Sequence, residues 1–151
     1  MRDAGARVET VELDVGIDTF RPVSEDDPTQ HHIHTEHFNV GACAAAAVEE
    51  TREKGGRVIA IGTTSVRALE SSFDPEEERV VVSGGTTSLF ILPGYRFQVV
   101  DALVTNFLVP RSTLLMMVSA FAGRAPVLAA YETAKREGYR FLSFGDAMLI
   151  L

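Results

Sequence analysis

The residue types best suited to chemistry gather at residues 57–70, RVIAIGTTSVRALE. A short apolar run predicts a buried strand, and a glycine, three hydroxyl residues and an arginine then open a helix. The first N–H groups of a helix favour an anion, and a guanidinium gives forked hydrogen bonds to a carboxylate or a phosphate. A helix cap beside a solvated arginine is the alternative. The ligand-binding residues predicted here are Gly62, Thr63, Thr64, Ser65 and Arg67.

All four histidines fall within residues 31–37, HHIHTEH. Side chains two positions apart share a face of an extended segment, so His32, His34 and Glu36 would line one side. Such a trio suits acid–base catalysis or a metal ion, and a solvated loop is the alternative. Alternation on a strand is a weaker metal signal than histidines at helical spacing. We therefore predict these three residues as catalytic and predict no metal site.

Two later positions also suit a ligand. A Pro-Gly turn presents Tyr95 and Arg96, and an aromatic beside an arginine fits a flat base or a phosphate. The alternative is that Tyr95 packs and Arg96 covers apolar surface with its stem. Asn106 ends a predicted strand and is a hydrogen-bond partner for a ligand, or else a turn residue. Asp146 follows a glycine and is interpreted as a turn residue rather than a contact to a ribose or a cation.

Apolar periodicity and chain breakers predict the elements that position these residues. The predicted strands cover 8–15, 58–61, 80–82 and 97–104, and the predicted helices cover 40–54, 65–72, 112–121 and 126–136. The acidic segment 73–79 is predicted to be a solvated loop. This alternation predicts an α/β fold: one layered domain over residues 1–151, with a largely parallel sheet flanked by helices. Ligand sites in such folds lie at the carboxyl ends of strands.

Composition and charge restrict the class of protein. The chain has 151 residues with 46% hydrophobic and 23% charged residues, which is typical of a globular domain. A single cysteine, Cys43, excludes a disulfide scaffold and is expected to be a small core residue. The opening residues lack a signal peptide, and the apolar run 114–118 is too short to span a membrane. We expect a cytoplasmic protein with no membrane partner.

The charge is unevenly distributed along the chain. The net charge is −7, with a balance of −10 over residues 1–78 and of +3 over residues 79–151. A polyanion such as RNA is therefore expected to contact the second half. The cationic residues available there are Arg96, Arg111, Arg124, Lys135, Arg136 and Arg140.

Seven segments, taken in this order, resemble one family, the S-adenosylmethionine:tRNA ribosyltransferase-isomerases of queuosine biosynthesis. The matching segments cover 16–23, 32–36, 62–70, 93–97, 100–107, 112–123 and 138–150. The resemblance implies a two-domain enzyme in which a β-barrel-like domain interrupts an α/β domain. This chain resembles only the C-terminal part, so the absent N-terminal portion is an expected partner.

The resemblance also implies a reaction. The family moves the ribosyl part of S-adenosylmethionine onto a 7-aminomethyl-7-deazaguanine base in tRNA, giving epoxyqueuosine with release of adenine and methionine. The chain is accordingly expected to be a transferase and isomerase whose partners are S-adenosylmethionine, as substrate, and tRNA. No metal or separate cofactor is implied.

Three motifs depart from the family pattern, with two histidines, a glutamate, an aspartate and a glycine replaced; in one of them a Thr-Asp before a Phe-Ile strand is here Thr87-Ser88. The family's His-Val-Gly-x-Gly-Thr-Phe is here DVGIDTF, residues 14–20, and its Asn-Phe-His-Leu-Pro-Glu-Ser is NFLVPRS, residues 106–112. Asp14 and Leu108 thus replace histidines, and acid–base chemistry needs groups that hold and pass protons. We expect little turnover by this chain alone. The alternative is a non-catalytic or truncated relative that retains nucleoside or RNA binding.

Overall fold

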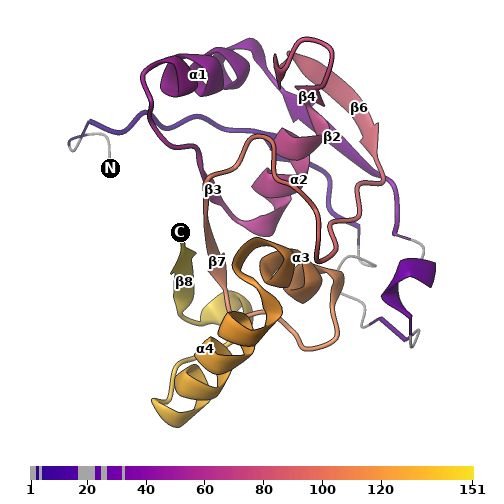
Figure 1. The fold of residues 1–151 in the computed structure, drawn as a ribbon, viewed down its shortest axis with the longest axis vertical. Helices are drawn as coiled ribbons and strands as arrows, with labels where there is room; N and C mark the ends of the chain where they lie inside the picture. Colours follow the sequence, from indigo (N-terminus) through magenta and orange to yellow (C-terminus); the bar gives the residue numbers. More distant parts are fainter. Residues whose placement is uncertain (1–2, 4, 17–22, 25–26, 32) are drawn as a thin grey trace.

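A computed structural model describes residues 3, 5–16, 23–24, 27–31 and 33–151 (Figure 1). Its strands are β1 (Glu12–Leu13), β2 (Glu36–Val40), β3 (Ile59–Ile61), β4 (Phe73–Asp74), β5 (Arg79–Val80), β6 (Ser83–Thr87), β7 (Ala102–Asn106) and β8 (Ala147–Ile150). Its α-helices are α1 (Ala42–Glu53), α2 (Thr63–Ser71), α3 (Thr113–Ala122) and α4 (Arg124–Arg136). Two short 3-10 helices are η3 (Pro28–Gln30) and η4 (Leu142–Phe144). The fold is mixed α/β.

The strands form two three-stranded sheets and a hairpin, so the prediction of a largely parallel sheet is wrong. One sheet has the antiparallel order β1-β2-β6, and β4 pairs with β5. In the other sheet, β3-β7-β8, β3 and β7 are parallel and β8 is antiparallel to β7. Along β2, Glu36 and Val40 are buried whereas His37 and Asn39 are exposed. An antiparallel sheet tolerates such a solvated face, whereas a parallel sheet needs cover on both.

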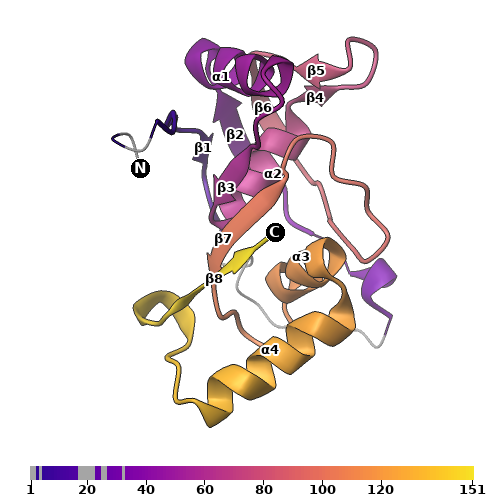
Figure 2. The same cartoon turned by 60° about the vertical axis from the view of Figure 1, so that its left-hand side comes forward.

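Helix α2 is the central element of the fold. It contacts strands of both larger sheets (Figure 2), and six of its nine residues are buried. One cluster of buried apolar side chains runs from Val40 through Val66 and Leu103 to Val118 and Tyr131. Whatever α2 presents at its N-terminus is therefore held by the core.

The predicted helices are confirmed, with small shifts at their ends. Ser112 caps α3 by accepting a hydrogen bond from the Leu115 N–H at 3.2 Å, and Gly123 ends the helix with a φ of 84°. In α1 the buried face is formed by Ala44, Ala45, Ala47 and Val48. Cys43 lies on the exposed face of α1, so the prediction of a core cysteine is wrong.

Four predicted segments differ in extent, and of these the predicted strand 80–82 overlaps β5 only at Val80. Residues 97–100 do not join a strand, because Glu70 accepts the N–H groups of Gln98, Val99 and Val100 that a neighbouring strand would need. The predicted strand 8–15 is paired only over β1. The predicted loop 73–79 is closed by the β4–β5 pair, with the Asp74 carboxylate accepting N–H groups inside the turn.

Helix length and composition determine whether a helix could span a membrane. Within the described residues, no single helix is both long and apolar enough to cross a bilayer. Together α3 and α4 reach that length and composition, but the chain bends by 112° between them.

Candidate functional site

A groove of about 540 Å³ opens where β3 and β7 end. The two strands run parallel, so their carboxyl ends lie at one edge of the sheet, as expected for a ligand site in this class of fold. Five of the predicted ligand-binding residues line it: Gly62, Thr63, Thr64, Arg67 and Asn106. The groove therefore joins two motifs that lie about 40 residues apart in the chain.

The start of α2 presents backbone to this groove. Gly62 has a φ of 91°, in the region that favours glycine, and its N–H donates to the Val104 carbonyl at 2.8 Å. Gly62 has no side chain to cap the helix, and within the described residues no side-chain cap is seen there, so the positive end of α2 favours an anion. The Ser65 hydroxyl donates back to the Ile61 carbonyl at 2.8 Å and is absent from the groove lining, although it was predicted to bind the ligand.

Arg67 is buried in the second turn of α2. Its Nε donates to the Leu89 carbonyl at 3.3 Å, and its Nη1 donates to Glu36. Its Nη2 is buried and has no hydrogen-bond partner within the described residues. Leaving a buried donor unpaired costs about 1–3 kcal/mol, more when the group is charged. Arg67 is thus the group in this groove with the strongest physical need for a ligand.

Glu36 holds Arg67 from the neighbouring sheet. Its buried Oε2 pairs with Arg67, and its Oε1 accepts the Gly16 N–H at 3.1 Å. Gly16 follows Val15, which lines the groove. Glu36 was predicted to be catalytic, and the structure shows its carboxylate engaged in a buried ion pair. It links the N-terminal segment to the guanidinium.

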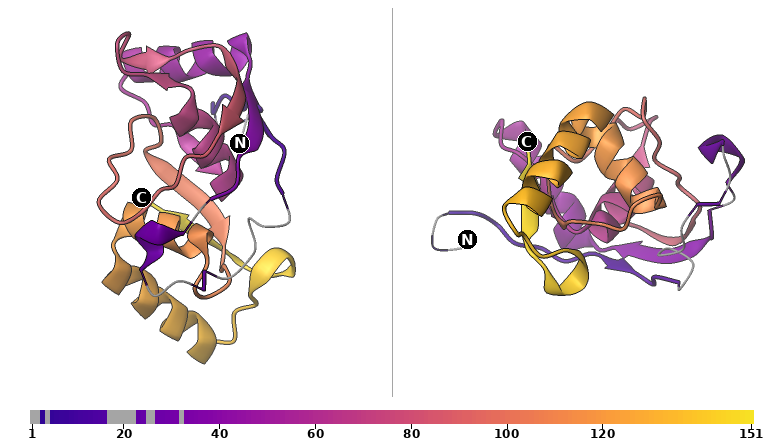
Figure 3. Two further views of the ribbon diagram at one scale, coloured as in Figure 1. Left: turned by 90° about the vertical axis from the view of Figure 1, so that its right-hand side faces the viewer. Right: turned by 90° about the horizontal axis from the view of Figure 1, so that it is seen from below.

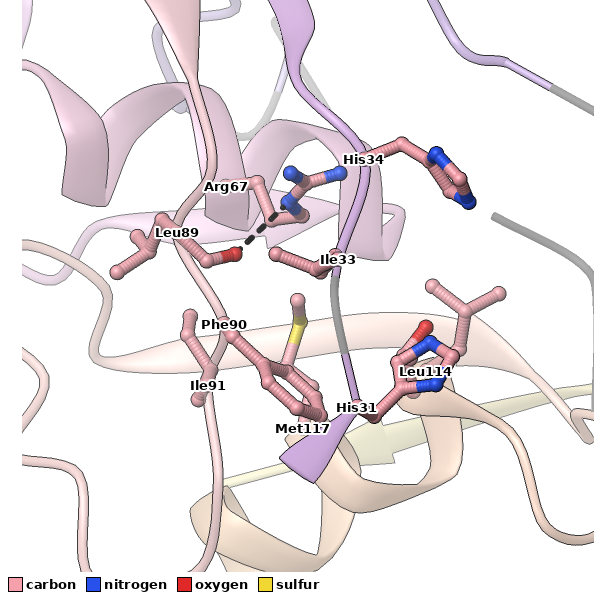
Figure 4. Close-up of a pocket in the computed structure, with 10 residues that line it drawn as sticks. His31, Ile33, His34, Arg67, Leu89, Phe90, Ile91, Leu114 and Met117 are labelled. Carbon is pink, nitrogen blue, oxygen red and sulfur yellow. Dashed lines mark hydrogen bonds between the residues drawn. The ribbon is translucent and has the colours of Figure 1, made fainter. Parts of the chain in front are cut away.

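Two of the three described histidines lie beside a second, much smaller cavity, whereas His37 is exposed on β2. This cavity of about 10 Å³ is lined by His31, His34, Phe90 and Arg67 together with apolar side chains (Figure 4). The His31 and Phe90 rings meet edge to face at 5.9 Å, and in Figure 4 the His34 ring and the Arg67 guanidinium lie on opposite sides of the segment carrying His34. A cavity of this size holds about one water molecule.

The predicted catalytic trio is only partly described. His34 is exposed and precedes β2, whereas Glu36 is buried within β2, so these two do not share an open face. His32 lies outside the described residues. Among the residues the structure does describe, no three His, Cys, Asp or Glu side chains are grouped as metal ligands would be.

Tyr95 and Arg96 lie away from the groove. The Tyr95 hydroxyl donates to Glu70 at 3.0 Å, and its ring meets Phe97 at 5.1 Å. Burial, followed by the nearby Glu70 carboxylate, raises the pKa of Tyr95. Arg96 is exposed. The position of Tyr95 matches the alternative in which it packs.

Asn106 joins the groove to the turn before β8. Its Nδ2 donates to the Asp146 carbonyl at 3.2 Å, and the Asp146 carboxylate accepts the Arg140 N–H at 2.8 Å. That backbone hydrogen bond, with Arg140's side chain, lowers the pKa of Asp146. Asp146 is a turn residue, as predicted.

Sequence reasoning missed most of the apolar lining. The missed residues include Leu13, Val15, Leu108, Val109, Leu114 and Leu142. Leu13 comes from β1 in a separate sheet, Val15 comes from the segment that follows β1, and Leu142 comes from η4. Only Leu108 was signalled in advance, as a departure from a family motif.

This chain is similar to proteins of queuosine biosynthesis. A family profile described as "Queuosine biosynthesis protein" matches residues 1–150. Proteins named S-adenosylmethionine:tRNA ribosyltransferase-isomerase are similar: that of Symbiobacterium thermophilum is 54% identical over 97% of this chain, and that of Pelotomaculum thermopropionicum 53% identical over 100%. The chain spans only 43% and 44% of these relatives' own lengths.

A solved structure agrees with this comparison. The crystal structure titled S-adenosylmethionine tRNA ribosyltransferase from Thermotoga maritima is 52% identical, with a TM-score of 0.72. The match covers 77% of this chain and 40% of that one.

Proposed function

Because this chain belongs to the queuosine biosynthesis protein family, we propose that it forms part of an S-adenosylmethionine:tRNA ribosyltransferase-isomerase. Its reaction would transfer the ribosyl moiety of S-adenosylmethionine to a 7-aminomethyl-7-deazaguanine base in tRNA, giving epoxyqueuosine. S-Adenosylmethionine is then a substrate, with no metal or separate cofactor. The observation that carries the proposal is the groove in which the start of α2, Arg67 and Asn106 come together.

The groove has the size and polarity for such a ligand. Small-molecule sites commonly enclose about 300–1,000 Å³ and combine apolar walls with a few polar groups. We assign the methionine carboxylate to the positive end of α2 and Arg67, where an anion is favoured. The apolar walls at Leu13, Val15 and Leu108 then accept the adenine.

Glu36 acts in this proposal as a positioning residue. Together with the Leu89 carbonyl it fixes two sides of the guanidinium and leaves Nη2 for the ligand. Nη2 is enclosed, so a ligand reaches it only when a wall of the groove moves. Leu114 lines both the groove and the small cavity beside Arg67, so its side chain is the one to move.

A further portion of protein would complete the site. Ile61, Val104 and Leu149 are paired in register across β3, β7 and β8, so they share one face of that sheet. Ile61 and Leu149 are 55% and 60% exposed, and Ile59 is 48% exposed. More than half of each relative's length lies beyond the part matched here. We propose that this portion covers the apolar face and closes the groove, while tRNA is the macromolecular substrate.

One observation favours the second candidate, a relative that binds without turnover. Leu108 lines the groove at a position where the family motif carries a histidine, and leucine cannot transfer a proton. An open groove also fails to align the reactants, and alignment contributes about 7–11 kcal/mol to such barriers. The two candidates share the binding step and differ only in chemistry.

Isothermal titration of the 151-residue chain with S-adenosylmethionine tests the shared step. We expect saturable binding that R67K weakens and that R124K, an exposed arginine on α4, leaves unchanged. A folded chain with no binding would contradict the proposal. Adenine release with tRNA carrying the modified base then separates the candidates, and we expect none from this chain alone.

A further inference from the structure

We propose that Phe144 is a stacking platform for a base of an RNA substrate, an inference that rests on the proposed function. Phe144 is 94% exposed, more than any other large apolar side chain in the described part of the molecule. A single exposed phenylalanine is ordinary by itself. The turn that holds it and its place beside the groove are what distinguish it.

The turn around Phe144 is rigidly built. The Gly145 N–H donates to the Leu142 carbonyl at 3.0 Å, and the Asp146 N–H donates to the Arg140 carbonyl at 2.8 Å. The Asp146 carboxylate in turn accepts the Arg140 N–H at 2.8 Å. A Cβ at Gly145 would lie 2.3 Å from the Arg140 carbonyl oxygen, so only glycine fits. The ring is therefore presented by a backbone with little freedom.

The turn also holds backbone strain. Leu142 has a φ of 64°, a conformation that non-glycine residues rarely adopt, and its N–H donates to the Phe107 carbonyl at 2.9 Å. Strain of this kind gathers at functional sites. The hydrogen bond to the Phe107 carbonyl holds the turn against the end of β7, beside the groove.

Phe144 lies outside the groove, so a ligand that contacts it must be longer than a nucleoside. Leu142 and Ser143 line the groove, whereas Phe144, the next residue, does not. Figures 2 and 3 show the η4 turn projecting from the body of the molecule, beside β8 and apart from the axis of α4. A nucleoside enclosed in the groove would contact only the lining residues. A base stacked on Phe144 must therefore belong to a ligand that extends beyond the groove.

RNA has the chemistry to occupy this rim. Unstacked RNA bases stack on exposed aromatic rings with little dependence on sequence. Arg140 in the same turn is exposed and supplies a cation for a phosphate, although Asp146 lies 3.5 Å from its guanidinium. The excess of positive charge in the second half of the chain acts in the same direction.

The chain contains no tryptophan, which allows a direct test. F144W places a single tryptophan at the platform, and V82W places one at a residue 64% exposed. Val82 lies between β5 and β6, which Figure 2 shows at the end of the molecule remote from η4. The ligand is an anticodon stem-loop RNA carrying 7-aminomethyl-7-deazaguanine, with S-adenosylmethionine alone as a second ligand.

We expect the RNA to quench F144W fluorescence and to leave V82W unchanged. F144A should lower RNA affinity about tenfold, while F144W retains it and S-adenosylmethionine binding stays constant in all variants. Thermal unfolding of F144A should match that of the parent chain, because an exposed ring contributes little to folding.

The other results overturn the inference. RNA binding with no quenching of F144W shows that no base stacks there. Quenching by S-adenosylmethionine alone assigns the ring to adenine instead. A loss of stability in F144A assigns it to packing. If RNA fails to bind while S-adenosylmethionine binds, this inference fails and the nucleoside site stands; if a folded chain binds neither, the proposed function fails as well.

Discussion

Helix α2 carries two buried charged side chains one turn apart, Glu70 and Arg67, and their surroundings differ. Glu70 is 6% exposed, and its carboxylate accepts the N–H groups of Gln98, Val99 and Val100 at 2.9–3.0 Å and the Tyr95 hydroxyl at 3.0 Å. Arg67 is 3% exposed and leaves Nη2 without a partner within the described residues. Burial alone therefore does not separate a structural charge from a functional one.

The difference lies in how completely each charge is satisfied. Four donors around one carboxylate compensate its desolvation, so Glu70 stabilises the loop that leads into β7. An unpaired buried donor destabilises the protein until a ligand accepts its hydrogen bond, and relief of this penalty then strengthens ligand binding. On this comparison we expect Glu70 variants to lose stability and Arg67 variants to lose binding.

The largest effect is expected from E70A. The substitution leaves three backbone N–H groups of residues 98–100 without their acceptor, and the free energy of unfolding should fall by about 3–5 kcal/mol. Urea denaturation measures this, with E132A on the exposed face of α4 as the matched control. A loss below about 1 kcal/mol would show that the loop finds other acceptors.

At Arg67 the informative variant is R67K. Lysine keeps a positive charge beside Glu36 but lacks the planar fork, so the fold should persist while ligand affinity falls. We expect a loss of about 1.5–3 kcal/mol in S-adenosylmethionine binding, the range for a hydrogen bond to a charged group, measured by titration calorimetry. Unchanged affinity in folded R67K would remove Arg67 from the site.

The double variant R67M/E36Q sharpens this result. R67M alone leaves Glu36 as a buried, uncompensated charge, which is strongly destabilising. Removing both charges should restore much of the stability without restoring binding. Restored binding would mean that the pair serves only the fold.

The contrast between Arg67 and Glu70 was partly visible in the sequence. The strand, the glycine, the hydroxyls and Arg67 are local in the chain, so periodicity and helix-start signals predicted their junction correctly. The partner of Arg67 lies 31 residues away in another sheet, and no local pattern encodes that pairing. That Nη2 has no partner among the described residues follows from the packing of the core, which no local pattern encodes.

Glu70 explains the clearest error. Residues 97–104 read as one apolar strand, yet the buried carboxylate captures the backbone of residues 98–100 and delays the strand to Ala102. Tertiary contact overrides strand propensity here. Local sequence patterns also fail to predict the groove lining, because Val15 and Leu142 reach the groove from segments distant in the chain.

A smaller effect is expected from Y95F, which removes one of the four donors to Glu70. The three backbone donors remain, so stability at neutral pH should fall by about 1 kcal/mol. Burial, followed by the Glu70 carboxylate, raises the pKa of Tyr95 above its unfolded value of about 10. The parent chain should therefore lose stability as pH rises above about 10, where only the unfolded phenol ionises.

Urea denaturation at pH 8 and above pH 10 measures this dependence. Y95F should lose less stability over that interval than the parent chain. Some loss remains, because burial also raises the pKa of Tyr131. Equal pH dependence in Y95F and the parent would contradict the closed environment of Glu70.

The smallest expected effect tests whether the polar part of the ligand site extends beyond α2 to Asn106 on β7. Asn106 lines the groove, and its Nδ2 donates to the Asp146 carbonyl at 3.2 Å, so N106A removes a polar wall and one tie to the η4 turn. We expect S-adenosylmethionine affinity to fall by about 0.5–1 kcal/mol, in the range of a neutral hydrogen bond. The matched control is N39A, whose asparagine donates to Glu12 at 3.2 Å on an exposed strand face away from the groove. If N106A and N39A bind equally well, the polar part of the site ends at α2. If N106A loses far more than R67K, the assignment of the main anchor to Arg67 is wrong, and β7 rather than α2 carries the ligand.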